Sequence, residues 1–257
     1  IDRLGSWLER LQERLNRNPE DAKSWYLLGH AALKLSDASA AAQAFAKTDA
    51  LVENDVSVKF YWLQARLMAN NGQLDNVSEG LANQLLSMDP NNSPVLELLS
   101  VTMMQRGDLH QAIRYMNRAI TASGNVDRQI ALASAITVLS GRLDAKAPHI
   151  AVSVTATAEP EDRAVVFVVA RPPGGGMPYA AVRRPAAMLP FNVQLDDLVS
   201  MSEGRSLSAA EEFEILVRVS KQGIAQANTD DWVWRSAVMT QQDLQNGKAV
   251  KATLQPN

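Results

Sequence analysis

Three histidines, His30, His110 and His149, are the residues best suited to bind a metal or transfer protons. A zinc site needs three or four convergent ligands, and these histidines share no ligand spacing. A haem would need an axial ligand inside a large apolar pocket. The chain has no cysteine, which excludes disulfides, thiolate metal sites and cysteine nucleophiles. No G-x-S-x-G motif marks a serine nucleophile. We therefore expect no enzyme activity, no metal and no cofactor.

Other features carry weaker chemical signals. The run PPGGG at 172–176 lacks the Lys-Ser/Thr of a phosphate-binding loop and precedes a predicted strand, so we interpret it as a connecting loop. Arg171, Arg183 and Arg184 flank this loop, either as a small basic patch or as solvated strand ends. Two Asp-Asp pairs stand at 196–197 and 230–231. Neither fits a calcium-binding loop, so we expect solvated loop carboxylates.

Composition narrows the class of protein. The 257 residues, 46% of them hydrophobic, suffice for two domains with buried cores. A net charge of −3 gives no excess of basic residues for nucleic acid or an anionic membrane surface. No apolar run approaches the roughly 20 residues that span a bilayer. The chain begins at Ile1 and not at Met, so we expect a mature or trimmed piece whose N-terminal membrane anchor is missing.

Helical repeats fill the first half. The clearest begins at Ala22 and follows the 34-residue spacing of a tetratricopeptide (TPR) repeat: Trp25, Leu28, Gly29, Ala32, Ala41 and Phe45. This pattern places Gly29 and Ala41 where two antiparallel helices touch. Tyr61, Ala65, Met68 and Gly72 follow the same pattern in the second repeat. We predict repeats at about 22–56, 58–92 and 93–126, an amphipathic helix at 3–16 before them, and a capping helix at 127–140 after them.

The first helix of each TPR hairpin lines the concave side of the array. The side chains expected there are Tyr26, His30, Leu33, Lys34, Trp62, Arg66, Asn70, Glu97, Val101, Met104 and Gln105. This mixture of aromatic, aliphatic and polar groups suits an amphipathic helical peptide. Lys34, Arg66 and Asn70 also offer a weak clamp for a carboxylate. Alternatively, Tyr26 and Trp62 pack against neighbouring hairpins.

The pattern changes near residue 144, where β-branched residues begin to alternate. Strands are predicted at 149–158, 164–171, 178–184, 191–198, 212–219, 232–239 and 248–254. Short strands separated by Pro- and Gly-rich turns are typical of an antiparallel β-sandwich. We therefore predict an α + β two-domain protein, with a TPR-like α-solenoid over 1–143 and an antiparallel β-sandwich over 144–257.

The second half carries a specific resemblance. Its segments are RAVVFVVARPPGGGMPYAAVRR (163–184), LPFNVQLDD (189–197), MSEGRSLS (201–208) and ILVRVSKQGIA (215–225). Placed after TPR repeats, they resemble the periplasmic part of the CcmI (CycH) family of c-type cytochrome biogenesis proteins. The chain departs from the family pattern with Tyr179, where Leu is frequent, and with a third glycine in the loop. The resemblance covers nearly the whole chain, and the β-domain supplies its specificity.

The resemblance implies a function. Members of this family look like periplasmic chaperones, anchored to the bacterial inner membrane, that hold the C-terminal helix of apocytochrome c and present the client for haem attachment. The haem chemistry would belong to other cytochrome c maturation subunits. The family has no signature motif in its client site, so no residue role is transferred from it.

Two other hypotheses remain open. In the first, the TPR half is a non-catalytic assembly scaffold that docks other subunits, while the client binds elsewhere. In the second, the β-domain is a hydrolase or a carbohydrate-binding module. Its support is that Trp232 and Trp234 share one strand face, which core packing explains equally well.

Overall fold

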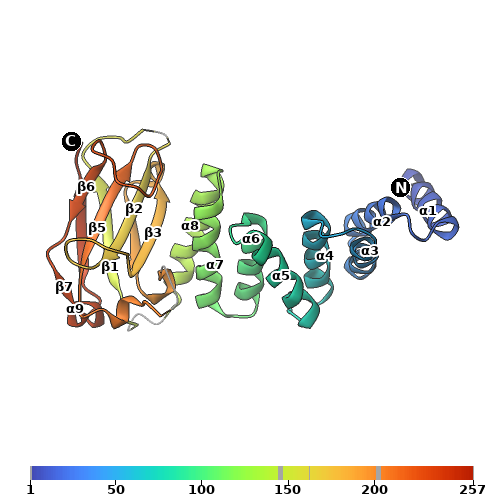
Figure 1. Cartoon of the computed structure of the whole chain (residues 1–257), viewed down its shortest axis with the longest axis horizontal. Coiled ribbons are helices and arrows are strands. Elements are labelled where there is room, and N and C mark those ends of the chain that lie inside the picture. The colour runs from blue at the N-terminus through green and yellow to red at the C-terminus, as the bar shows by residue number, and fades with distance from the viewer. Residues whose placement is uncertain (1, 144–146, 162, 201–203, 257) are drawn as a thin grey trace. The chain divides into compact units, whose positions relative to one another are not determined.

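The chain forms two compact units in the computed structural model, residues 1–107 and 108–257 (Figure 1). The structure describes residues 2–143, 147–161, 163–200 and 204–256, with the backbone alone for 2–6. Residues 201–203 of the segment at 201–208 therefore lie outside the described part. The predicted domain boundary at 143 and 144 adjoins residues 144–146, which also lie outside it, and it stays a prediction.

The first unit consists of helices at the predicted positions. Their bounds are α1 Asp2–Arg17, α2 Ala22–Lys34, α3 Ala38–Leu51, α4 Val56–Ala69, α5 Asn76–Met88 and α6 Ser93–Gln105. Aspartate side chains cap the N-termini of four of them: Asp21, Asp37, Asp55 and Asp75. A carboxylate at this position accepts hydrogen bonds from backbone N–H groups that have no partner inside the helix. A short acidic residue therefore stabilises the N-terminus of each of these helices.

The first hairpin shows why the repeat spacing matters. Ala41 and Phe45 on α3 are fully buried. A Cβ at Gly29 on α2 would stand 2.8 Å from Phe45 ring atoms. Only glycine allows α2 to approach the Phe45 ring this closely, which confirms that Gly29 lies at the contact between antiparallel helices. Met68, in contrast, follows the repeat spacing but is 51% exposed, so it does not pack in the core.

The second unit begins with two helices, α7 Leu109–Ala122 and α8 Val126–Ser140. In the part of this unit that the structure describes, the strands that follow are β1 Ile150–Ala156, β2 Val165–Arg171, β3 Ala180–Pro185, β4 Phe191–Leu195, β5 Glu212–Ser220, β6 Trp232–Arg235, β7 Met239–Thr240 and β8 Ala249–Leu254. They form one sheet in the order β4-β1-β8 and another in the order β3-β2-β5-β6, with β7 also paired to β5. Figure 1 shows α7 and α8 beside β3, which both helices contact.

The two sheets enclose one core. The alternating runs Ile150–Val152–Val154 and Phe213–Ile215–Val217–Val219 are at most 1% exposed and pack in the same cluster. This arrangement confirms the predicted fold class. One strand pair differs from the antiparallel expectation, since β8 runs parallel to β1. A parallel pair needs a long connection, and here the chain passes through β2 to β7 and the short helix α9 (Gln241–Gln245) before it forms β8.

Several charged residues are less exposed than expected. Asp231 is 2% exposed and pairs with Arg218, which also donates to the carbonyl oxygens of Gln226, Ile224 and Ala225. The prediction of a solvated loop carboxylate is therefore wrong for Asp231. It is also wrong to regard Arg184 as a solvated strand end, because that side chain is buried.

The second unit also contains short 3-10 helices between its strands. The 3-10 helix η2 (Asp197–Val199) follows β4, and Asp197 accepts hydrogen bonds from Ser208 N and Oγ at 3.0 and 2.5 Å. The other 3-10 helices are η1 Ala186–Met188 and η3 Leu207–Ala209.

In the described residues, no helix has the length and apolar character needed to cross a membrane.

Candidate peptide-binding surface

The predicted binding residues lie on α2, α4 and α6, the first helices of the three predicted hairpins, except Asn70, which caps the C-terminus of α4. Contacts between Tyr26 and Tyr61 place α2 against α4, with ring centroids 6.1 Å apart. Helices α4 and α6 are also in contact. These three helices therefore carry one continuous face of the first unit, which we call the first-helix surface.

An aromatic cluster joins two of the predicted residues. The rings of Tyr26 and His30 lie 4.5 Å apart, edge to face. His30 also contacts Tyr61 at 4.4 Å and Phe45 at 5.2 Å. Such edge-to-face pairs favour a fixed ring arrangement. Tyr61 was not among the predicted binding residues, but its half-buried ring completes this cluster and makes it part of the candidate site.

The environment of the cluster controls the charge of His30. Burial lowers the pKa of His30, and the positive charge of Lys34 lowers it further. Burial also raises the pKa of Tyr26, with smaller contributions from Tyr61 and Asp55. Both shifts favour the neutral forms at pH 7. The cluster therefore offers a ligand uncharged aromatic surface with polar edges.

Trp62 combines the two roles predicted for it, exposure on the binding surface and packing against a neighbouring hairpin. Its ring is half-buried and packs against the small core of Ala32, Ala42 and Ala65. Trp62 therefore contacts the hairpin core and also retains exposed surface. A rigid, half-exposed tryptophan is well suited to anchor a partner side chain.

Arg66 and Asn70 already bind a carboxylate of the chain. Arg66 Nε and Nη2 lie 2.9 and 2.6 Å from Asp75 oxygens, and Asn70 Nδ2 donates to Asp75 Oδ2 at 2.9 Å. Arg66 first, then Ser78 and Asn70, hold the pKa of Asp75 well below its usual range. The predicted carboxylate clamp is therefore occupied by the cap of α5, and only its third member, Lys34, is outside this arrangement.

The remaining predicted residues differ in exposure. Val101 and Met104 on α6 are 43% and 38% exposed. Lys34 and Gln105 are exposed, whereas Leu33 and Glu97 are half-buried, and Glu97 Oε1 accepts a hydrogen bond from Ser93 Oγ at 3.2 Å. Met68 on α4 is also exposed, at 51%, but with about 100° between successive residues it lies on the opposite side of the helix from Arg66 and is not part of the first-helix surface.

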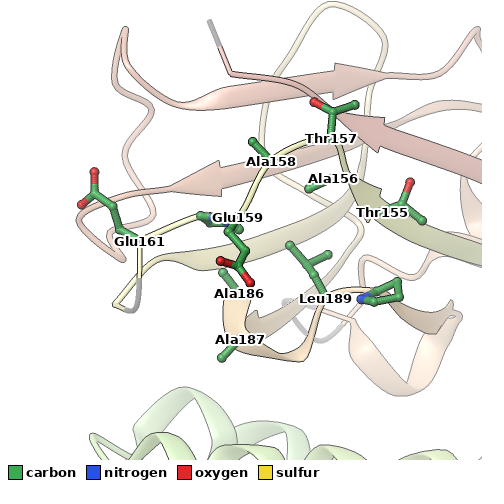
Figure 2. A pocket seen from close by; sticks show the side chains of 11 residues that line it. Thr155, Ala156, Thr157, Ala158, Glu159, Glu161, Ala186, Ala187 and Leu189 are labelled. Carbon is green, nitrogen blue, oxygen red and sulfur yellow. The ribbon is translucent and has the colours of Figure 1, made fainter.

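The β-domain has a hollow of about 700 Å³ at the end of β1. Its lining is mostly small, from Thr155 to Glu161 on one side and from Ala186 to Pro190 on the other. Figure 2 shows the Glu159 carboxylate directed toward Ala186, while Glu161 points away. Glu161 pairs with Lys221 at 3.9 Å. This hollow offers carboxylates and hydroxyls but no arrangement of nucleophile and base.

The aromatic residues that suggested carbohydrate binding pack inward. Trp232 is 7% exposed and belongs to the core of the β-domain, and Trp234 is half-buried against the same core. A carbohydrate platform needs exposed ring faces, so core packing accounts for this pair.

Comparisons with known proteins assign the family. The family model described as the TPR domain of cytochrome c-type biogenesis protein H matches residues 9–130, and the one described as its Ig-like domain matches residues 148–252. The chain belongs to the cytochrome c-type biogenesis protein H (CycH) family. The CycH assignment confirms the resemblance inferred from the sequence and names the β-sandwich as Ig-like.

Two relatives give the extent of the match. A Pseudomonas aeruginosa protein named cytochrome c-type biogenesis protein CycH is 28% identical over 245 residues, which cover 88% of this chain and 60% of that protein. The Haemophilus influenzae formate-dependent nitrite reductase complex bifunctional subunit NrfFG is 27% identical over 48% of this chain and 32% of its own length. This CycH-family chain therefore spans less than two thirds of either relative.

Solved structures resemble the chain only loosely. MamA from Desulfovibrio magneticus RS-1 is 16% identical with a TM-score of 0.42, covering 55% of this chain and 88% of its own. A TPR protein of Thermus thermophilus is 20% identical with a TM-score of 0.39, covering 56% of this chain and 77% of its own.

Proposed function

We propose that this chain is an apocytochrome c-binding chaperone subunit of a cytochrome c haem-ligation complex. In this proposal the first-helix surface holds the C-terminal helix of the client and presents the client for haem attachment. One observation carries the proposal: exposed aliphatic side chains stand beside a half-buried aromatic group on one face of the TPR helices in a CycH-family protein. The chain itself would be non-catalytic.

The chemistry of the first-helix surface supports a helical peptide as ligand. Amphipathic helices dock through apolar side chains at i, i+3, i+4 and i+7, which need an apolar strip on the partner. Val101 and Met104 supply aliphatic surface, and the flexible thioether of Met104 adapts to different side chains. Trp62 and Tyr26 add rigid aromatic area. The Arg66–Asp75 pair leaves few free charges, which disfavours a purely acidic tail.

We also propose that the chain acts on the periplasmic side of the bacterial inner membrane, anchored through a segment outside this sequence. Fusing alkaline phosphatase to the C-terminus of the full-length protein tests this placement, because the phosphatase folds actively only after export. An inactive fusion that is present in full amount would contradict it.

Calorimetric titration tests the chaperone proposal directly. The 257-residue chain is titrated with the C-terminal helix peptide of a cytochrome c from the same organism, beside a scrambled peptide of the same composition. We expect a Kd of about 1 μM, equivalent to about −8 kcal/mol, for the native peptide alone. Equal binding of both peptides, or of neither, would contradict the proposal.

A matched pair of variants locates the site. Met104→Ala on α6 removes an exposed thioether from the first-helix surface, whereas Met88→Ala removes one of similar exposure, 46%, from α5. We expect Met104→Ala and Trp62→Ala to weaken peptide binding at least tenfold, about 1.4 kcal/mol, and Met88→Ala to leave it unchanged. Equal effects of both methionine variants would move the site away from this surface.

The scaffold alternative predicts a different outcome for the same variants. If α2, α4 and α6 dock another maturation subunit, Trp62→Ala should release that subunit in a pull-down while client binding persists. Loss of client binding with the complex intact favours the chaperone.

A further inference from the structure

The second unit contains a cavity of about 270 Å³ between its helical hairpin and its strands. Helices α7 and α8 supply Ile113, Asn117, Ile136 and Ser140, among others. The strands and η2 supply a second group: Ala151, Val182, Arg184, Asn192, Gln194, Asp196 and Leu198. The volume equals that of about nine water molecules in the liquid. The walls are therefore part apolar and part polar, as in small-ligand sites.

Arg184 on β3 is the charged group that distinguishes this cavity. Its side chain is 5% exposed. Arg184 Nη1 donates to Asn117 Oδ1 at 3.1 Å and to the Arg183 carbonyl at 2.9 Å. Burial lowers the pKa of Arg184 to about 10, so the guanidinium stays charged at neutral pH. Among the described residues, no carboxylate lies within ion-pair distance of it.

Two other arginines in this chain show what the Nε–Nη2 edge of a guanidinium normally binds. Arg66 presents that edge to Asp75, with Nε at 2.9 Å and Nη2 at 2.6 Å. Arg171 presents it to Glu214, at 2.8 and 2.7 Å. Both Arg171 donors meet Glu214 Oε1, and in general this planar pair of donors suits a carboxylate. In Arg184 the same edge makes no hydrogen bond to any residue that the structure describes.

That edge faces accessible space. The fully enclosed side-chain atoms without a partner in the described part of the chain are Arg205 Nε and Ser220 Oγ. Arg184 Nε and Nη2 are not among them, so both retain accessible surface, and Arg184 lines the cavity. The cavity wall therefore includes a buried cation whose Nε–Nη2 edge has no hydrogen-bond partner among the described residues and is not fully enclosed.

Asp196 is the carboxylate on the cavity wall, and it does not neutralise Arg184. Its Oδ1 accepts a hydrogen bond from Leu198 N at 2.9 Å, and no ion pair joins it to Arg184. Burial raises the pKa of Asp196, with an additional contribution from Asp197, while His149 and His110 act in the opposite direction. The cationic edge is thus left for a ligand.

We propose that this cavity binds a small carboxylate with a branched apolar body, held by the Nε–Nη2 edge of Arg184. The carboxylate would supply the counter-ion that the chain does not provide, and the apolar body would pack on Ile113, Ile136 and Leu198. Asn192 and Gln194 can hydrogen-bond a polar substituent. This site is separate from the first-helix surface and does not depend on the peptide-binding proposal.

N-acetyl-leucine is a suitable probe, and its amide is the matched neutral control. The 257-residue chain is titrated with each while ¹H–¹⁵N spectra record the arginine Nε–H signals. We expect N-acetyl-leucine to shift the Arg184 Nε–H signal with a Kd of about 1 mM, as befits a dozen non-hydrogen atoms. The amide and inorganic phosphate should bind at least tenfold more weakly. No shift with the carboxylate, or equal affinity for phosphate, would overturn the proposal.

A neighbouring arginine provides the control for mutation. Arg184→Gln should abolish the carboxylate response, whereas Arg183→Gln should retain it, since Arg183 donates outside the cavity to the Thr121 carbonyl at 3.1 Å. Ala151→Leu keeps Arg184 and fills the cavity, so it should also abolish the response if Arg184→Gln fails to fold. Undiminished binding in a folded Arg184→Gln or Ala151→Leu protein would overturn the assignment.

Discussion

Single carboxylates in this chain have roles that their neighbours in sequence do not share. Asp75 is both the N-cap of α5 and the partner of Arg66, whereas Asp231 is buried against Arg218 and lies next to the exposed Asp230. Sequence reasoning treated the pair 230–231 as equivalent. Only burial and pairing separate the two, and both can be tested by replacing one carboxylate at a time.

Asp75→Asn tests the ion pair while keeping a good cap residue. Arg66 lowers the pKa of Asp75 in the folded chain, so this stabilisation is complete above the ordinary value of 3.8 and is lost as pH falls through the lower folded value. The side chain is 36% exposed, so the expected loss is only about 0.5–1 kcal/mol at pH 7. Urea unfolding at pH 7 and near pH 2 should show a difference that shrinks at low pH. A constant difference would contradict the ion-pair explanation.

Asp231→Ala should destabilise the second unit by about 3–5 kcal/mol, because it leaves the Arg218 guanidinium buried without its carboxylate. The matched control is Asp230→Ala, which removes an exposed carboxylate and should change stability by less than about 0.5 kcal/mol. Thermal unfolding followed by circular dichroism measures both. Similar effects of the two variants would show that the Arg218 pair contributes little.

At the scale of elements, the first unit depends on how closely its helices approach. Small residues such as Gly29 and Ala41 let α2 and α3 touch, while α2, α4 and α6 expose the aliphatic and aromatic groups of the first-helix surface. The helix spacing and the binding surface therefore follow from the same repeat pattern.

Replacing glycine by alanine should have opposite effects on stability at positions 29 and 80. A methyl group at Gly29 would stand 2.8 Å from Phe45, and we expect a loss of about 1–3 kcal/mol. Gly80 lies within α5 with no atom within 4 Å of its added Cβ, so alanine should stabilise that helix by about 0.5–1 kcal/mol. Denaturant unfolding of the full chain measures both. Stabilisation by both substitutions would mean that α2 and α3 pack less tightly than described.

At the scale of the whole molecule, α7 and α8 belong to the same compact unit as the sheets. Arg184 reaches Asn117, Arg183 reaches the Thr121 carbonyl, and Arg114 Nη2 donates to the Asp197 carbonyl at 3.3 Å. These contacts tie the hairpin to β3 and η2, and the pair of Arg184 and Asn117 lies in the wall of the 270 Å³ cavity.

Two fragments test whether the hairpin stabilises the sheets. A fragment of residues 108–257 should unfold cooperatively, whereas residues 144–257 lose the hairpin and leave Arg184 without Asn117. We expect the shorter fragment to be less stable by at least about 2 kcal/mol, which lowers Tm by about 5–10 °C at this size. Equal melting temperatures in calorimetry would favour a domain boundary at the change from helices to strands.

The sequence by itself determined the helices, the strands and the family. Repeat spacing fixed α2 to α6, and alternation fixed the inward faces of β1 and β5, because periodicity depends on local geometry. The first-helix surface followed from the same spacing, but Tyr61 was not predicted in it, because a half-exposed position has the same spacing as a buried one.

Only the tertiary structure decided which charges have partners. Asp75 binds Arg66 and Asn70 within one hairpin. Arg218 pairs with Asp231 across a loop, and Arg184 donates to Asn117, which is 67 positions away in the sequence. A side chain's burial and its counter-ion depend on elements brought together by folding. No local sequence pattern encodes these long-range contacts. The lack of a hydrogen-bond partner at the Nε–Nη2 edge of Arg184, among the described residues, could therefore be found only in the folded chain.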